Sequence, residues 1–320
     1  MEGVYMSLYG IGSATGKIIL MGEHSVVYGK PAIALPFASA RIETRVEFHQ
    51  HETTIDCLYY KGILAKAPAV IAGIKELITL TLKFLNKDNY GLHISIMSTL
   101  PPQRGLGSSA AVSVSIVRGL FDAFKIHLSD ENLNYLVSVA ERIHHTNPSG
   151  LDANTIATGK PVYFERGKSG EIIEVDMDAV LVVADTGESG QTRLAVAEVN
   201  AMLKDNPEYV ESLMNRLADL TNETRIHLQT KNVCEVGNCM NLAHEVLKTI
   251  RVSNDKLDHL TTVAVAEGAL GAKLTGSGKG GCMIALCANE EDSIHVSQKL
   301  KEAGAVDTWA YNLNGEQLND

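Results

Sequence analysis

The residues best suited to chemistry lie in a glycine- and serine-rich loop at residues 101–111, PPQRGLGSSAA, which runs directly into helix-forming sequence. Successive loop amides followed by a helix N-terminus form a cradle for an anion, and a polyphosphate suits such a cradle. Taken alone, the loop is equally well explained as a glycine-rich turn in which Ser108 caps the helix. A phosphate-binding role therefore needs support from elsewhere in the chain.

A second segment, ERIHHTNPSGLDANT at residues 141–155, provides that support. It places Glu141 late on an expected helix and Asp152 in an expected irregular segment after Asn-Pro-Ser-Gly. One carboxylate beside bound phosphates can hold Mg²⁺, and a second can accept a proton. The alternatives are a solvated charge at a helix end for Glu141 and a loop N-cap for Asp152. Glu141 and His144 also have the spacing Glu-x-x-His, which occurs in helical bundles that bind two metal ions. Such a site needs a second copy of the motif and two further glutamates, and none is evident in the sequence.

A second glycine loop, GSGKGG at residues 276–281, formally satisfies the dinucleotide pattern G-x-G-x-x-G. A dinucleotide loop must open a helix, whereas the CMIALC that follows is typical of a strand, and no acidic residue follows at the expected spacing of about 20. These features argue against NAD. Neither Lys279 nor Lys17 belongs to a P-loop, because glycine follows Lys279 and isoleucine follows Lys17 where Ser or Thr is required. No HRD or DFG string indicates a protein kinase.

Composition and charge restrict the partners. The 320 residues are 45% hydrophobic and 21% charged, as in a soluble globular enzyme, and their net charge is −10 at pH 7. That charge favours neither nucleic acid nor an anionic membrane, so an anionic ligand must be held by local donors such as loop amides and single lysines. With five cysteines, no Cys-x-x-Cys pair and no apolar run of 18 residues, we expect structural thiols and a cytosolic, cytoplasmic location.

Periodicity indicates the elements that position these residues. Residues 16–34 are expected to form two short apolar strands joined by a turn that presents Glu23 and His24. The other expected strands lie at residues 41–60, 91–98, 161–185, 271–287 (strand, glycine loop, strand) and 305–311. One expected helix lies at residues 69–86, and another runs from the first glycine loop to about Phe124. Further helices are expected at residues 130–145 and 207–228, in two shorter segments after residue 228, and at residues 291–302. This order predicts an α+β protein with a second domain beginning near residue 181.

Three segments, in this order along the chain, resemble the GHMP kinase superfamily, and the first resembles the mevalonate kinase family in particular. They are GKIILMGEHSVVYGKPAIA at residues 16–34, GLGSSAA at 105–111 with ERIHHTNPSGLD at 141–152 after it, and KLTGSGKGGC at 273–282. The resemblance implies a two-domain α+β fold. Residues 1–180 would form an ATP-binding domain like the second domain of ribosomal protein S5, and residues 181–320 a ferredoxin-like domain.

The resemblance also implies the roles of individual residues. Asp152 corresponds to the catalytic base and Lys17 to the lysine beside it, while Ser109 and Glu141 correspond to the Mg²⁺ ligands. The implied ATP-binding residues are Pro102, Arg104, Gly105, Leu106, Gly107, Ser108, Ser109 and Ala110. The implied acceptor-binding residues are Lys17, Glu23, His24, Asp152, Thr192, Gly276 and Ser277.

The match departs from the family at one point in each glycine loop, and the family pattern for the first loop is Pro-x-Gly-x-Gly-Leu-Gly-Ser-Ser. Gln103 replaces a glycine, Arg104 precedes Gly105, and Lys279 occupies a position that is usually glycine. These substitutions leave the core amides of the loops in place. The two added cations, Arg104 and Lys279, would favour phosphate.

The implied activity is phosphorylation of the 5-hydroxyl of mevalonate by ATP, with Mg²⁺ as the metal and a monomer or homodimer as the assembly. One alternative is a sister kinase that acts on phosphomevalonate or another small alcohol. The string GEHSVVYGKPAIA favours mevalonate, since a galactose-specific member would carry Thr-Asp after Gly-Glu-His. The other alternative is a non-catalytic metabolite sensor of the same fold, which the intact Lys17, Glu141 and Asp152 disfavour.

Overall fold

The computed structural model describes residues 9–99, 103–144 and 150–314, with side chains at all of these except residues 40 and 140–144. The chain forms two compact units, each assembled from three segments. The first unit contains Met1–Gly16, Ser39–Leu100 and Ser108–Gly159, and the second contains Lys17–Ala38, Pro101–Gly107 and Lys160–Asp320. Two long strands, β1 (Tyr9–Met21) and β2 (Ala32–His49), pass from one unit into the other. The proposed domain boundary near residue 181 stays a prediction.

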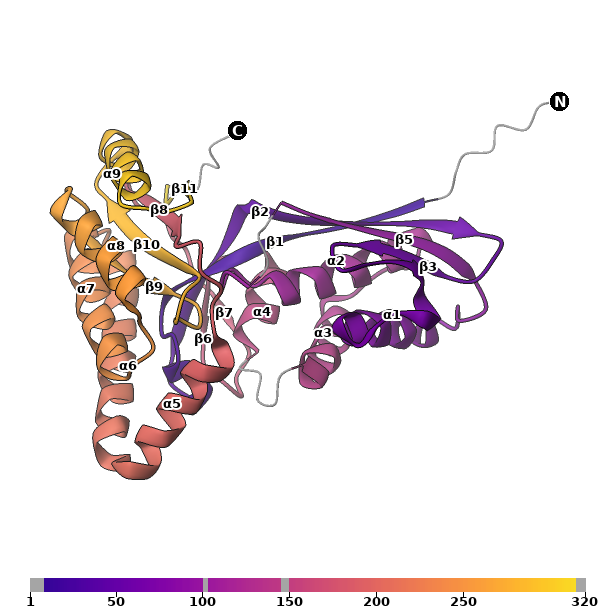
Figure 1. Ribbon diagram of the computed structural model, residues 1–320, viewed down its shortest axis with the longest axis horizontal. Coiled ribbons are helices and arrows are strands. Elements are labelled where there is room, and N and C mark those ends of the chain that lie inside the picture. The colour runs from indigo at the N-terminus through magenta and orange to yellow at the C-terminus, as the bar shows by residue number, and fades with distance from the viewer. Residues whose placement is uncertain (1–8, 100–102, 145–149, 315–320) are drawn as a thin grey trace. The chain divides into compact units, whose positions relative to one another are not determined.

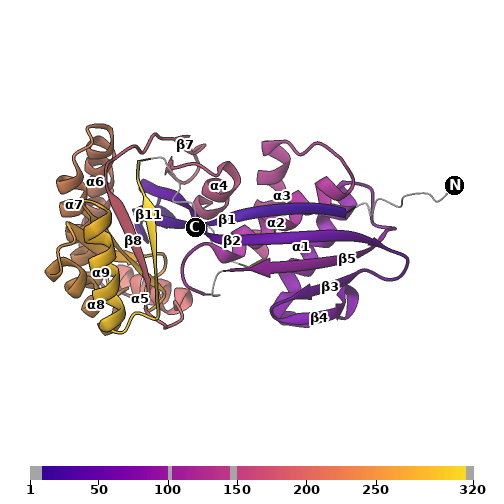
Figure 2. The ribbon, with the colours of Figure 1, turned by 90° about the horizontal axis from the view of Figure 1, so that it is seen from above.

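The first unit is a sheet with helices on one face. The C-terminal half of β2 pairs antiparallel with β5 (Gly91–Ser98), β5 pairs parallel with β3 (Thr54–Cys57), and β3 pairs antiparallel with β4 (Tyr60–Ile63). Strand β1 lies on the other side of β2 (Figure 2). Beneath the strands in Figure 1 lie α1 (Ala72–Phe84), α2 (Ser108–Ala123) and α3 (Asp130–His144), and α4 (Leu151–Thr158) packs against α2 and α3.

Helix α2 is held closely against β1 and α4. A Cβ atom added at Gly12 on β1 would lie 2.0 Å from the carbonyl oxygen of Ser115 on α2, so glycine is required for this approach. The Arg118 guanidinium donates hydrogen bonds to the carbonyl oxygens of Ser13 on β1 (2.7 Å) and Ala157 on α4 (3.0 Å). These contacts fix the helix that begins where the first glycine loop ends.

The second unit contains a four-stranded antiparallel sheet in the order β11-β8-β10-β9. Its strands are β8 (Val180–Asp185), β9 (Gly271–Thr275), β10 (Cys282–Cys287) and β11 (Asp307–Asn312). Along one side of the sheet in Figure 1 lie α7 (Val233–Thr249), α8 (Asp255–Ala266) and α9 (Glu290–Glu302). Helix α6 (Pro207–Gln229) packs against α7, and α5 (Thr192–Asp205) packs against α6.

The N-terminal half of β2 extends this unit and contributes Phe37 to its core. Phe37 contacts the rings of Trp309 and Tyr311 on β11 at centroid distances of 6.2 and 6.5 Å. Residues 32–34 of β2 pair antiparallel with β6 (Val162–Phe164), which pairs with β7 (Glu171–Ile172). The short 3₁₀ helices of the chain are η1 (Ser25–Tyr28), η2 (Leu64–Lys66) and η3 (Ala69–Ile71).

Two helices differ from the sequence-based expectation. Asp152 was expected in an irregular segment, which is wrong, because it lies in the first turn of α4 after Gly150. Helix α4 has eight residues, too few to show a helical period. Helix α5 was not expected; it buries the small Ala195 and Val199, while its apolar Leu194 and Val196 are exposed.

Candidate functional site

The first glycine loop belongs to the second unit and is attached to Lys17 on β1. The Lys17 amide donates to the carbonyl oxygen of Leu106 (2.9 Å), and Lys17 Nζ donates to that of Gly105 (3.0 Å). Gly105 and Gly107 have φ angles of 77° and 75°, in the left-handed region that favours glycine. The side chain of Leu106 is buried and anchors the loop. The predicted ligand Pro102 lies outside the described residues.

The second glycine loop packs its backbone against the first. A Cβ atom at Gly105 would lie 3.1 Å from the carbonyl oxygen of Thr275, and one at Gly276 would lie 2.9 Å from Gly105 Cα. Thr275 Oγ1 accepts a hydrogen bond from the Ile19 amide and donates one to the Ile19 carbonyl oxygen, each at 3.0 Å. The second loop connects β9 to β10, as expected, and its backbone packs against that of the first loop.

Glu23 and Lys273 form an ion pair in which both side chains are fully buried. Glu23 follows the end of β1, and Lys273 lies on β9. Burial raises the pKa of Glu23 and lowers that of Lys273, and the charge of each partner opposes these shifts. Glu23 Oε2 has no hydrogen-bond partner among the described residues. Lys273 was missed from sequence; its signal was a lysine inside the apolar string GAKLT.

His24 is buried beside Glu23, and its backbone φ is 61°. Nε2 lies 2.8 Å from the carbonyl oxygen of Ser277, so the Nε2–H group donates to it. Burial lowers the pKa of His24, which keeps the imidazole neutral at pH 7. This tautomer leaves Nδ1 as a hydrogen-bond acceptor. Ser277 of the second loop thereby lies beside the predicted acceptor ligand His24.

Thr192 is the first residue of α5 and is exposed. The segment that leads to it runs between the two glycine loops. The Gly190 amide donates to the carbonyl oxygen of Gln103 (2.8 Å), and the Gln191 amide donates to that of Gly278 (3.3 Å). The second unit thus contains residues 104–107 of the predicted phosphate loop and six of the predicted acceptor-binding residues, namely Lys17, Glu23, His24, Thr192, Gly276 and Ser277.

Both added cations of the glycine loops are in ion pairs. Arg104 Nε lies 2.8 Å from Asp185 Oδ2, and Lys279 Nζ lies 3.0 Å from Glu198 Oε2. That the two cations favour phosphate stays a prediction. Asp185 and Glu198 were not selected from sequence, because nothing local distinguishes them from other carboxylates.

The remaining predicted residues lie in the first unit. Ser108 and Ser109 begin α2, with Ser109 exposed, and they are followed by the buried Ala110. Glu141 lies in the last turn of α3, and Asp152 is half-buried at the start of α4. The described residues contain no group of three His, Cys, Asp or Glu that could hold a metal. Mg²⁺ needs only one or two protein oxygens when phosphates supply the rest, so a hydroxyl and a carboxylate fit this ion.

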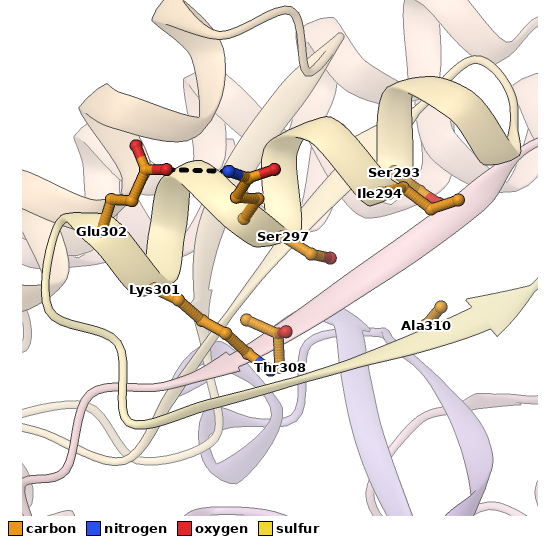
Figure 3. Close-up of a pocket in the computed structure, with 8 residues that line it drawn as sticks. Ser293, Ile294, Ser297, Lys301, Glu302, Thr308 and Ala310 are labelled. Atoms are coloured by element: carbon orange, nitrogen blue, oxygen red, sulfur yellow. Dashed lines mark hydrogen bonds between the residues drawn. The ribbon is translucent and has the colours of Figure 1, made fainter.

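A surface hollow between α9 and β11 contains none of the predicted residues (Figure 3). Two of its residues bond to each other, with Gln298 Nε2 donating to Glu302 Oε1 at 3.0 Å. Its lining consists of Ser293, Ile294, Ser297, Gln298, Lys301, Glu302, Thr308 and Ala310. Within the described part of the chain, no helix has the length and apolar character to cross a membrane.

Comparison with known proteins identifies the family. Residues 74–160 match the GHMP kinases N terminal domain, and residues 225–306 match the GHMP kinases C terminal domain. A mevalonate kinase of Pyrococcus furiosus is 33% identical over 89% of this chain and 91% of its own length. The crystal structure of mevalonate kinase from methicillin-resistant Staphylococcus aureus MRSA252 is 32% identical, with a TM-score of 0.74 over 96% of this chain and 99% of that one. That of L. major mevalonate kinase in complex with R-mevalonate is 27% identical, with a TM-score of 0.81 over 97% of each chain. These matches confirm the predicted two-domain α+β fold, and the chain belongs to the mevalonate kinases of the GHMP kinase family.

Proposed function

We propose that the protein transfers the γ-phosphoryl group of ATP to the 5-hydroxyl of mevalonate, giving 5-phosphomevalonate and ADP. The observation that carries this proposal is the one-third identity to mevalonate kinases over about nine-tenths of the chain. The arrangement of the second unit supports it, because Lys17, Glu23 and His24 all contact the glycine loops or the strand that precedes one of them.

The chain would hold ATP through the first glycine loop and the start of α2. Backbone N–H groups at residues 105–107 and the N-terminal end of α2 suit the phosphates, because the partial positive charge of a helix N-terminus favours anions. Ser109 and Glu141 would hold Mg²⁺, which when bound neutralises charge on the phosphate oxygens. Ser109 Oγ is an uncharged oxygen and Glu141 a carboxylate, the two kinds of ligand that this ion accepts.

The acceptor would be activated and held by the remaining residues. Asp152 would take the proton of the 5-hydroxyl, and the Lys17 ammonium would stabilise negative charge that develops on the attacking oxygen. The neutral His24 offers Nδ1 as an acceptor to a hydroxyl group, while Glu23, Thr192, Gly276 and Ser277 complete the proposed acceptor set. Positioning of the two substrates then supplies most of the rate enhancement.

A coupled assay of ADP release with mevalonate, phosphomevalonate and galactose tests the proposal. Release of ADP only with mevalonate, and a new phosphomonoester signal in ³¹P NMR, is the expected result. Preference for phosphomevalonate or galactose would replace the proposed substrate with that of a sister kinase. Binding of mevalonate without ADP release would show a metabolite sensor instead.

A further inference from the structure

We infer that Arg104 is a positioning residue for the acceptor-binding segment, residues 185–192, and that its guanidinium does not bind the phosphates of ATP. The inference rests on the proposed function, in which Thr192 at the end of this segment contacts mevalonate. Its basis is the set of contacts that tie the phosphate loop to this segment within the second unit.

Among the residues that the structure describes, the Arg104 guanidinium donates hydrogen bonds only to residues 185–189. Nε donates to Asp185 Oδ2 at 2.8 Å, Nη1 to Ser189 Oγ at 3.3 Å, and Nη2 to the Gly187 carbonyl oxygen at 3.3 Å. The N–H donors of the planar guanidinium have fixed directions. Three hydrogen bonds to one segment therefore fix the position of the guanidinium charge and that of the segment. The side chain is only 15% exposed, which limits its freedom to turn towards another anion.

Asp185 is equally constrained. It is the last residue of β8, its side chain is 2% exposed, and its Oδ1 accepts a hydrogen bond from the Gly187 amide at 2.8 Å. An aspartate that bonds the backbone two residues later shapes a tight turn. Arg104 therefore holds, through Asp185, the turn by which the chain leaves the sheet. Loss of either partner leaves the other buried without its counter-charge.

Backbone contacts carry this constraint to Thr192. Gly190 donates to Gln103 of the phosphate loop, and Gln191 donates to Gly278 of the second glycine loop. The segment is thus held at its start by the Arg104 side chain and near its end by both loops. A change in the turn at Asp185 would shift the first turn of α5, where Thr192 lies.

The two roles of Arg104 predict opposite kinetic effects. A phosphate ligand contributes to ATP binding, so its loss would raise the KM for ATP and the Kd for ADP. A residue that positions the acceptor segment contributes to mevalonate binding, so Arg104→Met should raise the KM for mevalonate about tenfold or more. The Kd for ADP, measured by calorimetry, should stay within about twofold of the wild-type value.

Variants of the partner make the test independent of one substitution. Asp185→Asn should also raise the KM for mevalonate. The double variant Arg104→Met/Asp185→Asn should have a KM for mevalonate no higher than that of the more affected single variant, because the pair acts as a unit. Arg104→Lys keeps the charge without the planar guanidinium and should recover only part of the mevalonate affinity. If Arg104→Met does not fold, Arg104→Lys and Asp185→Asn still test the inference through the same KM measurements.

The matched control is Arg225→Met, which removes the ion pair with Glu171 in the same unit and touches neither glycine loop. Both KM values should stay within about twofold of wild type in this variant. A rise confined to ATP, or no change in either KM for Arg104→Met and Asp185→Asn, would overturn the inference. Failure of the proposed function is distinguishable, because the wild-type protein would then not phosphorylate mevalonate.

Discussion

At the residue scale, three charged side chains are buried together: Lys17, Glu23 and Lys273 are each at most 2% exposed. An isolated buried charge is strongly unfavourable, so a buried carboxylate and ammonium persist as a pair. The charge of Lys17 lowers the pKa of both Glu23 and Lys273. Removal of either lysine therefore leaves the pKa of Glu23 higher, because each ammonium opposes the effect of burial.

Replacement of Lys273 by Met should shift the pH dependence of catalysis. Burial already raises the pKa of Glu23, and loss of the Lys273 ammonium removes the main opposing effect, so this pKa rises further. Because Glu23 is then ionised only at higher pH, the acidic limb of the kcat/KM profile for mevalonate should move upward in pH. The control is Lys301→Met at an exposed site, which should leave the profile in place. An unshifted limb in Lys273→Met would show that ionised Glu23 is not required.

Replacement of Asp152 by Asn should remove the proposed base. Loss of a general base typically costs about 10²- to 10⁴-fold in rate, so kcat should fall on that scale while the Kd for ATP is retained. Single-turnover kinetics with mevalonate and calorimetry with ATP measure the two effects. Asp88→Asn removes an exposed carboxylate elsewhere and should keep the wild-type kcat. Near-normal kcat in Asp152→Asn would refute the assignment of the base.

At the scale of elements, the position of α2 is decided by how closely β1 approaches it. The backbone of Gly12 on β1 lies against that of Ser115, and Arg118 links α2 to both β1 and α4. Helix α2 carries the proposed phosphate-binding end, and α4 carries Asp152. One set of packing contacts in the first unit therefore positions both elements.

Gly12→Ala should displace α2 and weaken the first unit. The added methyl group would lie 2.0 Å from the Ser115 carbonyl oxygen, so the strand and helix must separate. Overpacking of this kind costs about 1–3 kcal/mol in the free energy of unfolding, which denaturant titration measures. ATP affinity should fall as well, because the start of α2 moves. Ser13→Ala, at the adjacent half-buried position, is the control, and equal stabilities of the two variants would contradict the packing argument.

At the scale of the whole molecule, acid stability should depend on a buried histidine that joins α7, α8 and β9. His244 Nδ1 accepts a hydrogen bond from the Leu274 amide (3.4 Å), and Nε2 lies 3.0 Å from Thr261 Oγ1 and 3.2 Å from Asp258 Oδ1. Burial lowers the pKa of His244 from 6.5 to about 4, so the folded protein holds it neutral.

The free energy of unfolding should therefore fall as the pH drops from 6.5 to about 4. Within that window the unfolded chain binds a proton at His244 and the folded protein does not, so acid favours unfolding. At about 1.4 kcal/mol for each pKa unit, the loss approaches about 3 kcal/mol. Urea titrations at several pH values should show a smaller acid loss in His244→Gln than in wild type. The control His259→Gln, at an exposed site, should lose as much free energy of unfolding in acid as wild type does. An equal acid loss in His244→Gln would show that His244 does not cause it.

Short-range pattern in the chain was sufficient for the glycine loops, for most helices and strands, and for the family. Loop amides, glycine conformations and apolar periodicity depend on residues close in sequence, so GLGSSAA and KLTGSGKGGC were recognisable before any fold was known. Periodicity did not predict helix α4, because eight residues are too few to display a helical period. Its start nevertheless carries Asp152, the proposed base.

Only the tertiary structure decided which charges meet. Lys273 pairs with Glu23 across 250 positions of sequence, and Arg104 pairs with Asp185 across 81. Neither pairing follows from local pattern, because each depends on which strand ends and loops the packed sheet brings together. Burial then determines the consequence, since the same lysine would be an ordinary solvated charge on an exposed strand but must have a partner inside the core. The family and the glycine loops were therefore readable from the sequence, whereas the electrostatic partners of the charged residues were not.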